Sequence, residues 1–262
     1  WGGAPERLRA AAREALDEVE RLHAQLSAFD PSSDISDINA RASYEPVRVE
    51  PRLFNLLIRC RDLTTATRGA FNIAVGSMME TYGFRGARPE GEGTRPASPP
   101  PSAVILDPSE RTVTFARDGV KLDLGAIGKG YALDEAAAIL RECGIEGALI
   151  HGGTSSIVAI GTDPDGRPWK ISVPAREFGD ESAMTVELVD SALGVSARHG
   201  RIQGGVGHVM DPRSGTPVAE TRTAVVQGQS ATDADAFSTA LLVLGDGFLD
   251  TLAAKGYRGW LL

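Results

Sequence analysis

The glycine-rich segment at residues 120–134, VKLDLGAIGKGYALD, constrains the fold of this chain more than any other feature. Its apolar start predicts a strand at residues 120–122, and the apolar spacing after Gly130 predicts a helix. Glycines at such a bend let backbone N–H groups approach a ligand closely, the N-terminus of the helix attracts anions, and Lys129 adds a cation. The spacing matches neither a Walker loop nor the dinucleotide fingerprint. By itself the segment predicts either a phosphate site or a purely structural turn.

A second pattern lies in residues 234–245, which predict a helix that ends at Gly245. Asp235 and Thr239 are four positions apart, so they lie on one face of this helix. A carboxylate and a hydroxyl are oxygen ligands of the kind that Mg²⁺ prefers. The two residues alone leave a second interpretation open, in which the acid interacts with the helix dipole and the threonine bonds to its own backbone.

These two patterns and three others, in this order, make nearly the whole chain resemble the FAD:protein FMN transferase family, the ApbE-type flavin transferases. Residues 26–39, LSAFDPSSDISDIN, are similar to the family's opening segment. Residues 69–76, GAFNIAVG, are similar to its Gly-Ala-Phe-Asp-x-Thr-x-Gly block, and residues 208–217, HVMDPRSGTP, to its His-(Ile/Val)-x-Asp-Pro-x-Thr-Gly-x-Pro signature. The resemblance implies an α+β protein, an ApbE-like compound fold of mixed sheets with packed helices.

The resemblance also implies roles for individual residues. Mg²⁺ would be held by Asp235, Thr239 and an oxygen of Ala126, and the candidate catalytic residues are His208 and Lys129. FAD, the substrate, would be contacted by seven positions: Phe29, Ala70, Phe71, Asn72, Asp123, Lys129 and Met210. Phe29 takes the place of a tyrosine that stacks on a ring of the nucleotide, and a phenyl ring keeps the stacking.

In the family, a threonine or serine hydroxyl of an acceptor flavoprotein attacks the FMN-side phosphorus of FAD, and AMP leaves. This reaction requires in-line alignment and neutralisation of phosphate charge, which Mg²⁺, Lys129 and the helix N-terminus would supply. The expected partners are therefore FAD and an acceptor protein. Two alternatives remain open: a Mg²⁺-dependent FAD diphosphatase that uses water as the nucleophile, and an FAD-binding protein with little turnover.

Several positions depart from the family pattern. Asn72 stands where the family has aspartate, which keeps an acceptor oxygen but removes a charge. Gly128 replaces a frequent alanine, and residues 196–200, SARHG, replace a Thr-Ser-Gly-x-Tyr segment. We also expect the family's first strand, with its Met-Gly-Thr segment, to be missing or trimmed before Trp1.

Length and charge agree with this interpretation. The 262 residues suit one transferase domain over residues 1–262, or two interleaved halves. A net charge of −8 argues against nucleic acid or an anionic membrane as a partner, and we expect no membrane span. The two cysteines, Cys60 and Cys143, are too few for a disulfide framework or a zinc site, so we expect buried thiols. For this bacterial family the compartment stays open, either cytoplasmic or exported with a removed signal or lipid anchor.

The remaining elements follow from apolar spacing. Helices are predicted at residues 8–26 and from Pro51 to near Gly69, and a surface loop at residues 86–101. Strands are predicted at residues 103–106, 112–116, 120–122, 148–151, 156–160, 168–174, 183–188, 193–196 and 223–227. Because helices and strands are unevenly mixed along the chain, this pattern also indicates the α+β class.

Overall fold

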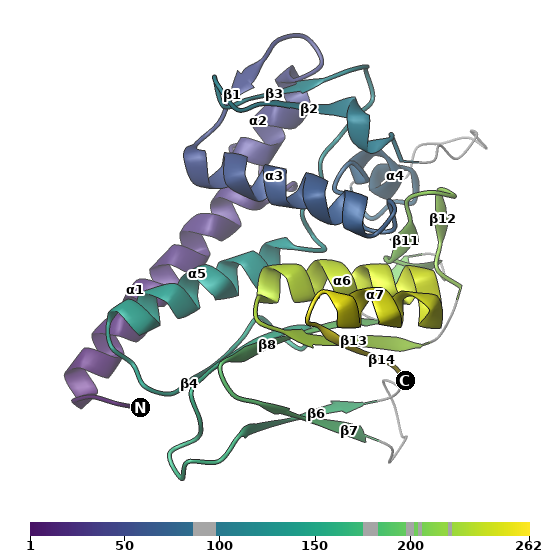
Figure 1. The fold of residues 1–262 in the computed structure, drawn as a ribbon. Coiled ribbons are helices and arrows are strands. Elements are labelled where there is room, and N and C mark those ends of the chain that lie inside the picture. Colours follow the sequence, from purple (N-terminus) through teal and green to yellow (C-terminus); the bar gives the residue numbers. More distant parts are fainter. Residues whose placement is uncertain (86–97, 175–182, 198–201, 204–205, 220–221) are drawn as a thin grey trace. The chain divides into compact units, whose positions relative to one another are not determined.

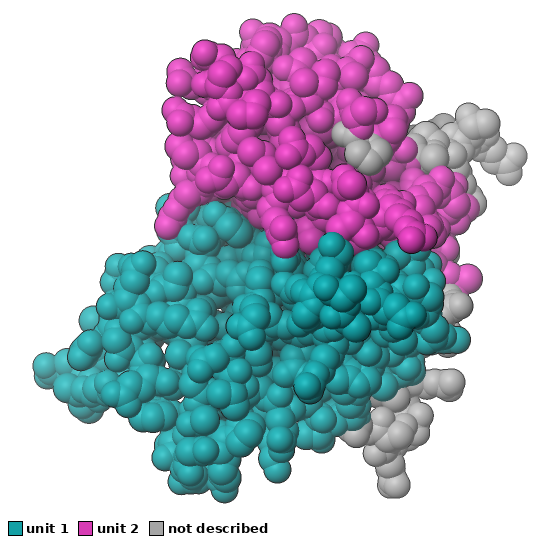
Figure 2. Space-filling model, in the orientation of Figure 1, with its two compact units in different colours: residues 1–23, 127–197, 220–262 teal, residues 24–126, 198–219 magenta. Residues whose placement is uncertain are grey.

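The computed structural model describes the chain except for residues 86–97, 175–182, 198–201, 204–205 and 220–221. The chain divides into two compact units, coloured separately in Figure 2. Unit 1 consists of Trp1–His23, Ile127–Ala197 and Glu220–Leu262, and unit 2 of Ala24–Ala126 and Arg198–Ala219. Each unit therefore combines segments that are distant in sequence, and the glycine-rich segment crosses from one unit to the other between Ala126 and Ile127.

Unit 1 is built on an antiparallel five-stranded sheet with the strand order β14-β13-β8-β5-β4, and β6 and β7 form a separate antiparallel ribbon. In the sheet, Val225 of β13 pairs with Val195 of β8 on one side and with Trp260 of β14 on the other. The elements of unit 1 are α1 (Pro5–Leu26, as far as His23), α5 (Gly128–Glu142), β4 (Ala148–His151), β5 (Ser156–Ile160), β6 (Trp169–Pro174), β7 (Ala183–Leu188), β8 (Ser191–Ala197), β13 (Thr223–Gly228), α6 (Ala231–Leu244), η3 (Gly245–Phe248), α7 (Leu249–Ala254) and β14 (Arg258–Leu261).

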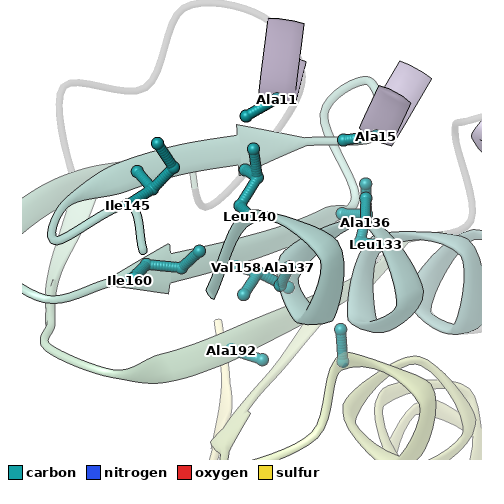
Figure 3. Packing of buried hydrophobic residues seen from close by; sticks show 11 residues of the cluster. Ala11, Ala15, Leu133, Ala136, Ala137, Leu140, Ile145, Val158, Ile160 and Ala192 are labelled. Carbon is teal, nitrogen blue, oxygen red and sulfur yellow. The ribbon is translucent and has the colours of Figure 1, made fainter. Parts of the chain in front are cut away.

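Strand β5 is buried along its whole length because both faces of the sheet are covered (Figure 1). Successive side chains of a strand point to opposite faces. Ile157 and Ala159 accordingly pack with apolar residues of the β6–β7 ribbon, whereas Val158 and Ile160 pack with helices α5 and α1. Figure 3 shows the helical side of this core, where small side chains bring the helices close to the sheet: Ala11, Ala15, Ala136 and Ala137.

Helix α6 is held against its neighbours by unusually close backbone approaches. A Cβ atom on Gly130 of α5 would lie 2.1 Å from the carbonyl oxygen of Ala231, and one on Gly194 of β8 would lie 2.3 Å from that of Ala234. Glycine is therefore required at both positions. In addition, the Asp134 carboxylate of α5 accepts backbone N–H bonds of 2.9 Å from Ala231 and Thr232 in the first turn of α6. These contacts fix the helix that carries the candidate metal ligands.

Within the described residues, one helical stretch, Ala231–Ala254, has the length and apolar composition of a membrane-spanning helix, and an 18-residue window of it has a mean hydropathy of 1.3. On length and composition the sequence expectation of no spanning run is therefore not met. The buried core helix of a globular domain passes the same test, however. Helix α6 carries Asp233 and Asp235, each 5% exposed, and packs against α5 and β8 in the way a core helix does.

Unit 2 contains a three-stranded antiparallel sheet with the order β1-β3-β2, and two short hairpins. Helix α3 begins at Pro51 as predicted and buries Leu53, Leu57 and Leu63 on its inner face. Cys60 of the same helix is buried, whereas Cys143 at the end of α5 in unit 1 is only partly buried. The elements of unit 2 are α2 (Asp34–Arg41), β1 (Val47–Arg48), α3 (Pro51–Ala66), α4 (Gly76–Thr81), η1 (Pro101–Ala103), β2 (Val104–Asp107), β3 (Thr112–Phe115), β9 (Ile202–Gln203), β10 (Val206–Gly207), β11 (Met210–Asp211) and β12 (Thr216–Pro217).

The strand predicted at residues 120–122 is wrong. Val120 and Leu122 are buried, but the polar groups of this segment are bonded outside any sheet. Leu122 N–H donates to the side chain of Asn39 at 2.6 Å, and the Asn39 amide donates back to the Leu122 carbonyl at 3.0 Å. Asp123 N–H donates to the carbonyl of Ile73 at 2.7 Å. The apolar pattern thus indicated burial correctly. The backbone groups of the segment, however, bond to the Asn39 side chain and to Ile73 and not to a neighbouring strand.

Candidate active site

In unit 1, Asp235 brings three elements together. Its carboxylate on α6 accepts the backbone N–H of Gly130 on α5 at 2.7 Å. It also accepts the hydroxyl of Ser156 on β5, whose Oγ lies 2.8 Å from Oδ1 and 3.0 Å from Oδ2. Burial raises the pKa of Asp235 to about 6, although the charge of Lys129 and the hydrogen bonds from Ser156 and Gly130 lower it. A cation placed beside this carboxylate would favour its charged form.

Thr239 lies one helical turn after Asp235, in a network of hydroxyl groups. Its Oγ1 is 3.2 Å from Oγ of Ser196 on β8, which in turn is 2.8 Å from Oγ of Ser238. Ser238 Oγ also donates to the Asp235 carbonyl at 3.0 Å. The polar face of α6 therefore meets hydroxyl side chains from both β5 and β8.

This donor set is consistent with Mg²⁺. All the candidate side-chain ligands are oxygens. The Asp235 carboxylate accepts hydrogen bonds from Gly130 and Ser156, and it has lone pairs left to bind a metal ion. Among the described residues, no group of three or more His, Cys, Asp and Glu is arranged to hold a metal. A metal at this position would therefore depend on a single carboxylate together with hydroxyl, backbone and phosphate oxygens.

The structure changes the interpretation of the glycine-rich segment. The N–H of Gly130 is bonded to Asp235, and the N–H of Gly125 donates to Oδ1 of Asp123 at 2.7 Å. Two of the glycines that were expected to face a ligand thus make internal hydrogen bonds. Lys129 is exposed in the first turn of α5 and remains available to attract phosphate.

In unit 2, Asp123 forms a largely buried ion pair that no sequence pattern indicates. Nε of Arg85 donates to Oδ2 of Asp123 at 3.0 Å, and the two side chains are only 7% and 12% exposed. The guanidinium carbon of Arg85 lies 5.6 Å from the centre of the Phe29 ring. Phe29 itself is 60% exposed, so its ring is accessible to a ligand. An arginine in an irregular segment gives no sequence signal that distinguishes a buried pair from a solvated charge.

Met210 is 5% exposed and packs with residues that directly precede Arg85. Its apolar cluster contains Met78, Tyr82 and Phe84. The hydroxyl of Tyr82 donates to the carbonyl of Gly215 at 3.0 Å, which ties the β11–β12 hairpin to the same segment. Residues 82–85 therefore connect three of the predicted FAD contacts, namely Phe29, Asp123 and Met210.

Asn72, which stands where the family pattern has aspartate, makes hydrogen bonds with both ends of its side-chain amide. Its Nδ2 donates to the carbonyl of Pro99 at 3.1 Å, and its Oδ1 accepts the N–H of Ala74 at 2.9 Å. The N–H of Ser98 donates to the carbonyl of Pro212. An aspartate at position 72 has no N–H to offer the Pro99 carbonyl at neutral pH. The amide thus fastens residues 98–99 beside the 69–76 block.

The other predicted residues differ in accessibility. Ala70 and Phe71 are 0% and 1% exposed, and their N–H groups bond to the backbone and side chain of Thr67, so their side chains build the core. His208 and Ala126 are partly buried in unit 2. Lys129, Asp235 and Thr239 belong to unit 1, and all other predicted site residues belong to unit 2. Of the 196–200 departure, Ser196 and Ala197 lie in β8, and the rest is outside the described residues.

The architecture is α+β, with one buried carboxylate site on a core helix and one aromatic–arginine–aspartate cluster. The ApbE family model matches residues 4–258, and the chain belongs to this family.

Relatives in sequence and structure agree with this assignment. A protein from Rhodobacter capsulatus named FAD:protein FMN transferase is 30% identical over 97% of this chain, which spans half of that relative's length. A Klebsiella pneumoniae (strain 342) protein of the same name is 31% identical over 90% of this chain and 76% of its own. The ApbE protein from Thermotoga maritima is 25% identical with a TM-score of 0.84, covering 97% of this chain and 86% of its own. The flavinyl transferase ApbE from Pseudomonas stutzeri, in its apo form, has a TM-score of 0.80 at 25% identity, covering 99% and 83% of the two chains. These neighbours confirm the predicted fold class.

Proposed function

We propose that this chain transfers FMN from FAD to a threonine or serine hydroxyl of an acceptor flavoprotein in a Mg²⁺-dependent reaction that releases AMP. The observation that carries the proposal is the Asp235 carboxylate in a member of the ApbE family. It is 5% exposed, is oriented by Gly130 and Ser156, and shares a helix face with Thr239. The two units would act together as one transferase domain.

The metal would be held by Asp235, Thr239 and an oxygen of Ala126. When bound, Mg²⁺ would neutralise charge on the diphosphate of FAD. Lys129 would add a positive charge at the phosphates, and His208 would accept the proton of the attacking hydroxyl.

The nucleotide would be recognised in unit 2. The exposed ring of Phe29 would stack on a ring of FAD. Asp123, Asn72 and Met210, with the backbone of Ala70 and Phe71, would complete the binding site. Asp123 would act with its partner Arg85, because their side chains form one buried ion pair.

The proposal is tested by incubating the protein with FAD, Mg²⁺ and an acceptor flavoprotein domain, and measuring both the mass of the acceptor and released AMP. We expect the acceptor to gain the mass of FMN in step with AMP release. AMP without a mass gain would support the diphosphatase alternative, and bound FAD without either product would support the binding protein. Asp233→Asn is a matched control for substitutions of Asp235. Asp233 is an equally buried aspartate of α6, but its carboxylate accepts a hydrogen bond from the hydroxyl of Tyr257.

A further inference from the structure

Arg85 is a buried cation in unit 2 that contacts two of the residues predicted to bind FAD. The residue is 8% exposed. Its guanidinium donates to Oδ2 of Asp123 at 3.0 Å and to the carbonyl of Leu122 at 3.1 Å. It also lies over the ring of Phe29, 5.6 Å from the ring centre. One side chain therefore contacts both an acidic residue and an exposed aromatic ring, each of which was predicted to meet FAD.

The first consequence concerns charge. A buried ion is stable only when it is paired and hydrogen-bonded, and Arg85 and Asp123 satisfy this requirement for each other. The second oxygen of Asp123 accepts the N–H of Gly125 at 2.7 Å. With Arg85 in place, the Asp123 carboxylate is neutralised. Without it, the same carboxylate would present a negative charge to any anionic ligand that approaches.

The second consequence concerns the ring. A guanidinium within about 6 Å of a ring centre attracts the face of that ring. The N–H of Phe29 is bonded to Oγ of Ser27 at 3.2 Å, which holds the backbone as well. Phe29 is nevertheless 60% exposed. Its ring is thus anchored by Arg85 while much of its surface stays open to a planar ligand.

We propose that Arg85 is a positioning residue that makes this site selective for a flavin that carries a diphosphate. It acts through Asp123, whose negative charge it cancels, and through Phe29, whose ring it holds for stacking. This inference deepens the proposed function and rests on FAD being the ligand of unit 2. The selectivity comes from charge, so it separates FAD from riboflavin, which has the same ring system and no phosphate.

The experiment compares the affinities of FAD and riboflavin by flavin fluorescence titration in EDTA, where the diphosphate keeps its full charge. We expect Arg85→Met to lower the affinity for FAD about 30-fold and the affinity for riboflavin about threefold. Only FAD carries phosphates that are repelled by the unpaired charge of Asp123. The double variant Arg85→Met with Asp123→Asn should restore the affinity for FAD to within about fivefold of wild type, since neither charge remains. Arg85→Lys keeps the positive charge, so its affinity for FAD should also stay within about fivefold of wild type.

Arg41→Met is the matched control, because Arg41 forms exposed ion pairs with Asp37 and Glu45 in the same unit. We expect it to change either affinity less than about twofold. Thermal unfolding of every variant identifies any that does not fold. If Arg85→Met alone fails to fold, the double variant and Arg85→Lys decide the question, because both avoid an unpaired carboxylate.

Equal losses for FAD and riboflavin in Arg85→Met, or no recovery of FAD binding in a folded double variant, would overturn the inference and leave Arg85 a structural residue. FAD affinity that is unchanged in Arg85→Met would overturn it as well. The proposed function has a separate readout, since a wild-type protein that binds FAD selectively but never modifies an acceptor contradicts the transferase alone. A wild-type protein that binds no FAD would overturn both.

Discussion

Two aspartates, one in each unit, are shielded from solvent but have different partners: Asp235 is buried and Asp123 is partly buried. Asp235 in unit 1 is held by neutral hydrogen-bond donors, the N–H of Gly130 and the hydroxyl of Ser156, and burial raises its pKa to about 6. Asp123 in unit 2 is paired directly with the guanidinium of Arg85. The first carboxylate lacks a contacting cation among the described residues, which suits a metal ligand. The second is already neutralised by the protein, which suits a site for an anionic ligand.

The largest effect is expected at Asp235. Asp235→Ala removes the only charged side chain of the proposed metal set, so we expect metal-dependent turnover to fall by about a hundredfold or more. Thr239→Ala removes a neutral ligand and should cost about tenfold. The measurement is acceptor flavinylation against Mg²⁺ concentration. Full activity of Asp235→Ala at limiting Mg²⁺ would show that the metal is held elsewhere.

The next effect concerns stability in unit 2. Arg85→Met leaves the largely buried Asp123 carboxylate without its partner, so we expect the free energy of unfolding to fall by about 3 kcal/mol. Removing both charges, with Asp123→Asn added, should recover most of this loss, since no unpaired charge remains. Urea titration of the single and double variants measures the difference. A double variant as unstable as Arg85→Met would show that Arg85 stabilises the fold by packing and not by its charge.

A third prediction uses pH to test whether Asp235 lacks a cation. Its folded pKa of about 6 lies above the ordinary value of 3.8, so the folded protein binds this proton more tightly than the unfolded chain. The resulting stability is fully present below about pH 4 and is lost as pH rises through about 6, by about 2 to 3 kcal/mol in Mg²⁺-free protein. Asp235→Asn should lack this part of the pH dependence. Unfolding titrations at several pH values, with and without Mg²⁺, provide the test, and identical profiles for variant and wild type would contradict it.

Lys129 in unit 1 and Phe29 in unit 2 are expected to affect different steps, the rate of FMN transfer and the affinity for FAD. Lys129→Ala should slow transfer more than it weakens FAD binding, because phosphate charge grows towards the transition state. Phe29→Ala should instead raise the FAD dissociation constant about tenfold, by analogy with base–aromatic stacking, and leave the rate at saturating FAD nearly unchanged. Single-turnover rates and binding titrations on both variants measure this difference. Parallel effects on rate and affinity in both variants would refute the division.

The smallest effect is expected at Asn72. Asn72→Asp removes the donor to the Pro99 carbonyl, so we expect a stability loss of about 1 kcal/mol and a change in FAD affinity of about tenfold or less. Asn72→Ser is a control that removes the same donor without adding a charge. Thermal unfolding and FAD titration compare the two. A sharp rise in acceptor flavinylation for Asn72→Asp would instead show that the family aspartate organises the metal and phosphates.

The sequence was most informative where the signal is periodic or local. The helices that begin at Pro5 and Pro51 and the strands β4, β5, β8 and β13 of the unit 1 sheet were predicted with small boundary differences, because their apolar spacing follows from burial on one face or both. The edge strand β14 of the same sheet was not predicted. Helices α2 and α4 are short and were not predicted, and the strand at residues 120–122 was wrong. In these cases the conformation depends on hydrogen bonds or packing with residues far away in the sequence. A short stretch of sequence carries no information about such contacts.

The sequence by itself determined the family, the fold class and the identity of the candidate ligands, because these depend on residue types in a fixed order. Only the tertiary structure decided how each group is used. In it, the N–H of Gly130 donates to Asp235, the amide of Asn72 to the Pro99 carbonyl, and the guanidinium of Arg85 to Asp123. Each of these hydrogen bonds joins residues at least 27 positions apart. Burial then sets how strongly each charge needs a partner, and burial exists only after the chain has folded.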